Sequence, residues 1–222
     1  MPKCDRVTKT IVFLAQQPHV QSYQTLMDWM VATYGKNAWY LLVACLLSLR
    51  ARDAMVLKMF PIIKDRVKAP QAIDALSMAG LEKMIRSIGF YRAKARTLKH
   101  VAREIIDRFD GDVPNSPQNM MSIKGIGQKT ANLVLWYAYG IQAGIAVDIH
   151  VHRVCNRLGV IETKTAEQTR KQLERCVPQK LWPAVNHACV ALGQQICVSQ
   201  SPWCSKCPMR LMCLRRGVRR SR

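Results

Sequence analysis

Four cysteines crowd into one short stretch of the sequence, and they constrain the fold more than any other feature. Cys197, Cys204, Cys207 and Cys213 stand in a C-x6-C-x2-C-x5-C pattern. Four thiolates this close together can surround one metal centre, but so short a loop cannot build a hydrophobic core of its own. The rest of the chain must therefore fold into a domain that supports this loop.

The spacing of these cysteines bears on the kind of metal centre. Structural zinc sites usually draw on two separated C-x2-C pairs, and only Cys204 and Cys207 are spaced in that way. Iron–sulfur clusters accept uneven spacings, so the pattern favours a [4Fe–4S] cluster, with zinc as the alternative. The remaining five cysteines are Cys4, Cys45, Cys155, Cys176 and Cys189. We expect these five to be ordinary thiols, outside any metal site or disulfide.

The charge of the chain points to a polyanionic partner. Among 222 residues, 34 Lys and Arg stand against 14 Asp and Glu, a formal net charge of +20. Nucleic acid is the leading candidate, because binding it releases condensed counterions. An anionic membrane surface, or solubility alone, is the alternative.

Neither the first residues nor the most apolar stretch indicates export or a membrane span. No basic segment at the start precedes an apolar run, so we expect no signal peptide. Residues 38–49, the most apolar stretch, fall short of the roughly 20 residues that cross a bilayer. We therefore expect an intracellular protein without a membrane partner.

Helical periodicity dominates the sequence and predicts an all-α fold. Ser22 is expected to cap a helix that Gly35 ends, and a stripe from Leu98 to Phe109 predicts a long helix. Residues 165–177 and 180–195 are also compatible with helices.

Two of the expected helices flank a tight glycine turn. Ser116 and Pro117 begin the first, and Gly140 ends the second. Glycines let a backbone approach a ligand closely, and the N–H groups at the start of a helix attract a phosphate. The candidate phosphate-binding residues are Lys124, Gly125, Ile126 and Gly127. Such turns also join helices in many folds without binding anything.

Lys129 and Asp148 are the candidate catalytic residues. Lys129 falls in the first turn of the second helix, where the helix dipole disfavours an ammonium ion and so favours a nucleophilic amine. Asp148 stands at the start of a further helix that Gly159 closes. The simpler interpretations are a solvated surface lysine and a plain N-cap.

The combination of these features resembles the helix-hairpin-helix DNA glycosylase superfamily, and more narrowly its endonuclease III branch. The resemblance runs from about Leu41 to Cys213. The matching segments, in order, are Ile123–Leu135, Gly144–His150, Val154–Arg157 and the four-cysteine loop.

The resemblance implies a two-lobed all-α fold. One lobe is a six-helix barrel domain over residues 31–141, with the helix-hairpin-helix at about 117–139. The other is a discontinuous [4Fe–4S] cluster domain that residues 1–30 and 142–222 form together.

The resemblance also implies an activity. The chain would be a monomeric base excision repair enzyme, a DNA glycosylase with AP lyase activity that removes oxidised or saturated pyrimidines from duplex DNA. Lys129 would form a Schiff base with the sugar, and Asp148 would assist it. The target nucleotide would flip out of the stack.

Three further residues would contact DNA in this family. Arg50 and Phe90 match the positions of the loops that fill the gap left by the flipped nucleotide, and His150 follows Asp148. The best-known bacterial pattern has glutamine and leucine at the first two positions, so the opposite-base preference stays open. Lys124 replaces a common proline.

Two other functions are compatible with parts of the pattern. One is a monofunctional mismatch glycosylase for thymine, uracil or adenine, with water as the nucleophile. The other is a non-catalytic iron–sulfur protein that binds DNA or senses redox state. The presence of both Lys129 and Asp148 favours the bifunctional enzyme. Residues 214–222 carry five arginines, which either contact phosphates or form a solvated tail.

Overall fold

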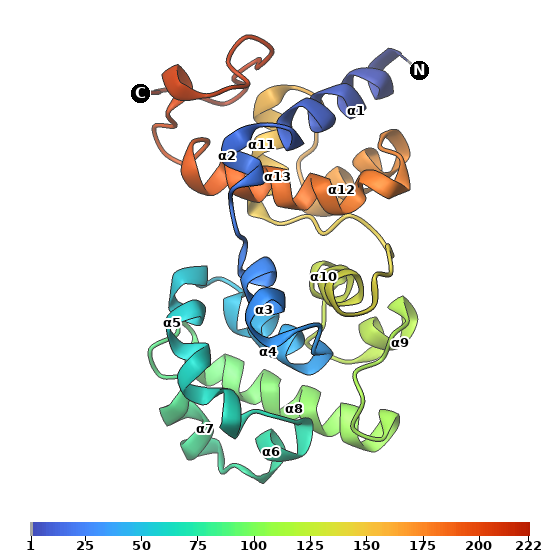
Figure 1. Ribbon diagram of the computed structural model, residues 1–222, viewed down its shortest axis with the longest axis vertical. Helices are drawn as coiled ribbons and strands as arrows, with labels where there is room; N and C mark the ends of the chain where they lie inside the picture. Colours follow the sequence, from blue (N-terminus) through green and yellow to red (C-terminus); the bar gives the residue numbers. More distant parts are fainter. Residues whose placement is uncertain (1) are drawn as a thin grey trace. The chain divides into compact units, whose positions relative to one another are not determined.

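The computed structural model describes residues 2–222, and these form helices and turns with no strand (Figure 1). The expected all-α class is confirmed. The chain forms two compact units: Leu26–Ala143 is one, and the described residues up to Thr25 together with Gly144–Arg222 are the other. The first boundary between the two units lies at Leu26, whereas we expected it at residue 31. The helix that begins at Leu26 packs on the next helix of the same unit and so belongs to that unit.

The first unit, Leu26–Ala143, is built around one almost fully buried helix. This helix, α4 (Ala38–Ser48), is the most apolar stretch of the sequence, and Trp39 and residues 41–47 are buried in it. It packs against α10, α3, α5 and α8. The helices of this unit are α3 (Leu26–Tyr34), α4, α5 (Asp53–Ile63), η1 (Lys64–Arg66), α6 (Pro70–Ala75), α7 (Met78–Met84), α8 (Tyr91–Phe109), α9 (Pro117–Ser122) and α10 (Gln128–Tyr139).

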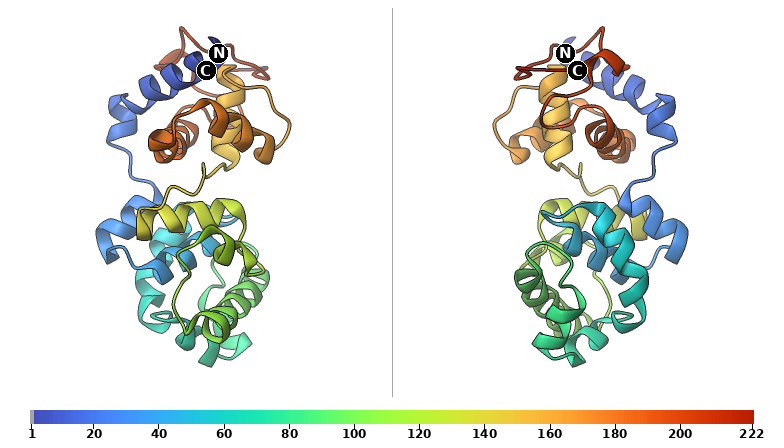
Figure 2. Two further views of the ribbon diagram at one scale, coloured as in Figure 1. Left: turned by 90° about the vertical axis from the view of Figure 1, so that its right-hand side faces the viewer. Right: turned by 90° about the vertical axis from the view of Figure 1, so that its left-hand side faces the viewer.

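The second unit joins the two ends of the described chain. Its helices are α1 (Pro2–Ala15), α2 (Pro18–Gln21), α11 (Ile149–Leu158), α12 (Ala166–Cys176), η2 (Gln179–Leu181), α13 (Trp182–Gln195) and η3 (Cys204–Lys206). α13 packs on α11, α1 and α2, so helices far apart in the sequence lie side by side (Figure 2). Across residues 2–222, no helix is long and apolar enough to span a membrane.

One expected helix start was wrong. The helix predicted to begin after Ser22 begins at Leu26 instead, and Ser22 ends the short helix α2, with its N–H donating to the Pro18 carbonyl at 2.9 Å. Pro18 at the first helical position starts α2, and Ser22 is the C-cap of that short helix. Gly35 ends α3 as expected, with φ at +70°.

Two of the five scattered cysteines differ from the expectation of free thiols. Cys4 and Cys176 form a disulfide, with their Cα atoms 4.5 Å apart. α1 packs along α12, which brings together two cysteines that are 172 residues apart in sequence. The other three, Cys45, Cys155 and Cys189, are free and buried.

Candidate functional site

The glycine turn lies between α9 and α10, as predicted. The Ser116 hydroxyl caps α9 by accepting the Asn119 N–H, and Gly140 ends α10 in the left-handed conformation, with φ at +71°. Within the turn, the Ile126 N–H donates to the Ile123 carbonyl at 3.0 Å. Each of these contacts is local in sequence, which is why the sequence predicts the hairpin well.

The two glycines of the turn have different roles. Gly125 has a φ of +105°, and a Cβ there would lie 2.8 Å from Cγ2 of Thr97 on α8, so the fold itself requires glycine. Gly127 has an ordinary φ of −89°, and a Cβ would meet nothing within 4 Å. It is the N-cap of α10 but brings no side-chain cap, so the first N–H groups of α10 stay open to an external anion.

Lys129 is the second residue of α10 and is half-buried, while Lys124 is exposed in the turn itself. α10 packs against α4, which carries Cys45. Burial raises the pKa of the Cys45 thiol to about 12, against the opposing charge of Lys129, so this neighbour of the lysine is neutral. Gln128 donates through Nε2 to Oδ1 of the buried Asn132 at 3.0 Å, which links the first residue of α10 to the next turn of the helix.

Asp148 is the N-cap of α11, in the second unit. Its Oδ1 accepts the N–H groups of His150 at 2.8 Å and of Val151 at 2.9 Å. Both hydrogen bonds fall on one carboxylate oxygen, which leaves Oδ2 available to a ligand. Asp148 and His150 are half-buried. Lys129 and Asp148 therefore each begin a helix, but on different units.

The loops that carry Arg50 and Phe90 approach each other within the first unit. Both residues are exposed and both have positive φ, 52° and 60°. A Cβ on Gly89 would lie 4.0 Å from the Arg50 carbonyl, so the two loops are in contact range. Two non-glycine residues in this sparsely populated conformation indicate loops that the surrounding structure holds in place.

A buried lysine holds these two loops together. Lys94 is 7% exposed, and its Nζ donates to the carbonyl of Leu47, just before the Arg50 loop, at 2.7 Å. Its backbone N–H donates to the Phe90 carbonyl at 3.1 Å. Burial lowers the pKa of Lys94 to about 8. Sequence reasoning missed Lys94, because its partner lies 47 residues away.

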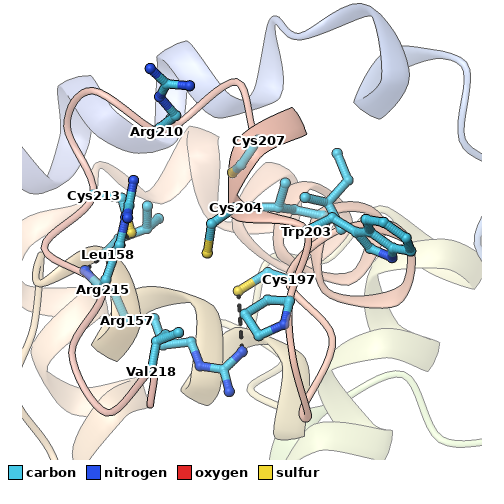
Figure 3. A pocket seen from close by; sticks show the side chains of 13 residues that line it. Arg157, Leu158, Cys197, Trp203, Cys204, Cys207, Arg210, Cys213, Arg215 and Val218 are labelled. Atoms are coloured by element: carbon cyan, nitrogen blue, oxygen red, sulfur yellow. Dashed lines mark hydrogen bonds between the residues drawn. The ribbon is translucent and has the colours of Figure 1, made fainter. Parts of the chain in front are cut away.

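The four cysteines line one cavity, and their sulfur atoms face a common space (Figure 3). Arg157 donates through Nη1 to the Cys197 sulfur at 3.6 Å, and the Arg215 N–H donates to the Cys213 sulfur at 3.4 Å. Among residues 2–222, no three His, Cys, Asp or Glu side chains come as close together as ligands of one metal ion do.

The chemistry of this cavity fits a positively charged metal centre. Burial raises the pKa of the Cys207 thiol to about 11 and raises that of Cys213. In this largely apolar cavity a thiolate needs a compensating charge, and metal coordination deprotonates a thiol outright. The N–H groups that point at Cys197 and Cys213 are the kind of donor that stabilises coordinated sulfur.

Two residues near this loop were missed by sequence reasoning. Arg153 donates to Nδ1 of His150 at 3.0 Å, to the Gly193 carbonyl at 2.9 Å and to the Cys197 carbonyl at 3.0 Å. Gly193 makes room for His150, because a Cβ there would lie 2.7 Å from Nδ1. The spacing of three residues on a helix is a sequence signal that Arg153 can contact His150. No sequence signal points to the role of Gly193.

Comparison with known proteins gives a consistent result. Residues 43–179 match the family model of the HhH-GPD superfamily base excision DNA repair proteins. Endonuclease III of Bacillus subtilis is 36% identical over 187 residues, which cover 84% of each chain. Endonuclease III of Thermotoga maritima is 35% identical over 78% of this chain and 80% of its own.

Solved structures are similar over most of the chain as well. One is an endonuclease III trapped in a covalent intermediate with DNA, with a TM-score of 0.77 and 32% identity over 87% of this chain and 97% of its own. A thermostable thymine-DNA glycosylase has a TM-score of 0.80 at 22% identity over 96% of both chains, which is a likeness of fold.

The contrast between the two turn glycines is testable. Gly125→Ala should lower the free energy of unfolding by about 2 kcal/mol or more, because it combines a positive φ with a clash against Thr97. Gly127→Ala should lower it by about 1 kcal/mol or less, but should weaken binding of undamaged duplex DNA by about 10-fold, the value of one charge-assisted hydrogen bond. Urea unfolding and fluorescence anisotropy measure the two quantities. Equal stability losses, or full DNA affinity in Gly127→Ala, would contradict this division of roles.

Proposed function

The chain belongs to the HhH-GPD superfamily of base excision DNA repair proteins, within its endonuclease III group, and we propose that it is a monomeric bifunctional DNA glycosylase. In this proposal it excises oxidised or saturated pyrimidines from duplex DNA and then cleaves the abasic site. The observation that carries the proposal is the position of Lys129, in the first turn of the helix whose open N–H groups suit a DNA phosphate.

Lys129 supplies the nucleophile in this proposal. Its neutral amine attacks C1′ of the sugar, the glycosidic C–N bond breaks and the base leaves with the electron pair. Ring opening gives a Schiff base between Nζ and C1′. Loss of a C2′ proton then breaks the bond between C3′ and its oxygen, and water releases the lysine. The similarity to an endonuclease III trapped covalently on DNA supports this route.

Asp148 supplies the carboxylate. Its Oδ1 is held by two N–H groups of α11, which fixes the orientation of the group, while Oδ2 accepts a proton or faces the positive charge that develops on the sugar. His150, which Arg153 and Gly193 hold in place, contributes a contact to DNA at the same helix end.

Arg50 and Phe90 fill the gap that the flipped nucleotide leaves. Phe90 is 65% exposed, an apolar side chain that intercalates between bases, and Arg50 offers hydrogen-bond donors to the unpaired base. Lys94 keeps the two loops together during this insertion. Lys124 and the turn Gly125–Gly127 bind the phosphate backbone.

The four cysteines hold a [4Fe–4S] cluster in this proposal. The endonuclease III relatives support the cluster over a zinc ion, and the four sulfur atoms around one cavity provide thiolate ligands for it. Cys197, Cys204, Cys207 and Cys213 would hold the cluster through their sulfur atoms, and the cluster would take no part in bond cleavage. These four cysteines therefore stabilise the loop beside α11, the helix whose N-cap is Asp148.

Borohydride trapping tests the proposed nucleophile. On an abasic duplex the wild-type protein should form a covalent adduct, because borohydride reduces the Schiff base. Lys129→Gln should lower adduct formation by at least about 1,000-fold, the order expected when a nucleophile is removed. Quantification by denaturing gel electrophoresis measures the effect.

The matched control is Lys83→Gln, which removes an exposed lysine of α7. It should trap as well as the wild type. An adduct of undiminished yield with Lys129→Gln would rule out Lys129 as the nucleophile. Base release from a thymine glycol duplex without any trappable adduct would favour the monofunctional alternative.

Asp148→Asn separates catalysis from helix capping. Asparagine caps a helix about as well as aspartate, so the free energy of unfolding should change by less than about 0.5 kcal/mol. The single-turnover rate constant of base excision should fall by about 100- to 10,000-fold, the usual contribution of a general acid or base. Urea unfolding and excision from a thymine glycol duplex measure the two effects.

A comparable N-cap provides the control. Thr165 caps α12 of the same unit by accepting the Gln168 N–H, so Thr165→Asn should leave both quantities near the wild-type values. If Asp148→Asn retained the wild-type excision rate, Asp148 would be only a helix cap.

A further inference from the structure

Residues Leu214–Arg222, which we name the arginine segment, follow the last cysteine and pack on the second unit. The Leu214 N–H donates to the Leu158 carbonyl at 3.4 Å, and the Arg216 N–H donates to the Arg157 carbonyl at 3.2 Å. These bonds attach the start of the segment to the last turn of α11. The segment therefore has a defined path although it contains no helix.

The other end of the arginine segment is attached to the cysteine loop. Arg222 donates its N–H to the Pro202 carbonyl at 2.8 Å, and its own carbonyl accepts the Ser205 N–H at 3.0 Å. Its guanidinium lies 3.8 Å from the ring centroid of Trp203, and its Nε donates to the Ser201 carbonyl at 2.9 Å. A cation over an aromatic ring adds to these hydrogen bonds.

Side chains also hold the segment between its ends. Leu214 packs over Gly159 so closely that a Cβ on the glycine would overlap it. Arg216 forms an ion pair with Glu162 at 2.7 Å. Arg215 and Val218 line the cysteine cavity itself. Two of the five arginines, Arg216 and Arg222, thus attach the segment to the protein.

Two of the remaining arginines face only solvent. Arg219 and Arg220 are exposed and make no side-chain hydrogen bond or ion pair with the described residues. Arg215 is exposed as well, but it also lines the cysteine cavity. No acidic residue occurs anywhere in residues 197–222, whereas Lys206 and Arg210 of the cysteine loop add two further exposed positive charges. Fixed, uncompensated positive charges on one segment form a site for a polyanion.

We propose that the arginine segment is a second surface for duplex DNA, on which Arg219 and Arg220 bind backbone phosphates. This segment belongs to the second unit, whereas the hairpin belongs to the first. The inference rests on the proposed function only in that the polyanion is duplex DNA. Phosphate contacts fix position without reading sequence, so the surface binds undamaged DNA flanking a lesion. Holding the arginines in place lowers the entropy lost on binding, which a free tail would not do.

The test removes the two exposed charges together. The variant Arg219→Gln, Arg220→Gln should bind undamaged duplex about 10-fold more weakly at low salt. The slope of log K against log[salt] should become shallower by about 2, because each phosphate contact contributes about 0.9. Fluorescence anisotropy over a salt series measures both. The iron content per chain should stay at the wild-type value, which shows an intact cysteine loop.

A charge-matched control lies on the same unit. Lys164→Gln, Lys180→Gln removes two exposed charges elsewhere and should change the salt slope by less than about 1. Leu214→Ser keeps every charge but removes the contact over Gly159, and it should also weaken DNA binding. Equal losses in both double variants, or full affinity in Leu214→Ser, would overturn the proposal.

Two further measurements distinguish this surface from the site of covalent trapping and from a membrane-binding patch. Trapping of abasic DNA at saturating DNA concentration should be unchanged in the arginine variant. A wild-type protein that binds DNA but never forms an adduct would contradict the proposed function and leave this surface standing. Binding of vesicles of anionic phospholipid should not depend on the two arginines. A variant that loses vesicle binding but keeps DNA binding would show that the partner is a membrane.

Discussion

The first N–H groups of a helix have no carbonyl partner within that helix, and two helix starts, one in each unit, satisfy these groups in opposite ways. At the start of α10, Gly127 provides no side chain, so the N–H groups are open to a phosphate. At the start of α11, Asp148 fills the same kind of position with its own carboxylate. The start of α10 therefore suits an anionic ligand, and the start of α11 holds a fixed carboxylate that suits a positively charged one.

The sequence predicted these two helix ends because their signals are local. Ser116 followed by proline, Gly140 and Asp148 each act through hydrogen bonds to residues a few positions away. The same local logic was wrong at Ser22, where Pro18 starts a separate short helix and moves the next one to Leu26. Residue-type preferences alone cannot decide between two adjacent caps, since both obey the same rules.

The sequence did not predict the contacts between segments that are far apart in the chain. Lys94 binds a carbonyl 47 residues away, and the disulfide of Cys4 joins residues separated by 172. The arginine segment, which composition left open between a solvated tail and a phosphate-binding surface, is held by carbonyls of α11 and the cysteine loop. Which segments become neighbours depends on the packing of whole helices, and periodicity gives only the buried face of each helix.

The central claim is that Lys129 forms the covalent bond to the sugar. The most direct measurement is peptide mapping by mass spectrometry of the adduct that borohydride traps on abasic duplex DNA. The account predicts that the sugar remnant is found on Nζ of Lys129, in the peptide that follows Gly127. A remnant on another lysine or on an α-amino group would contradict it.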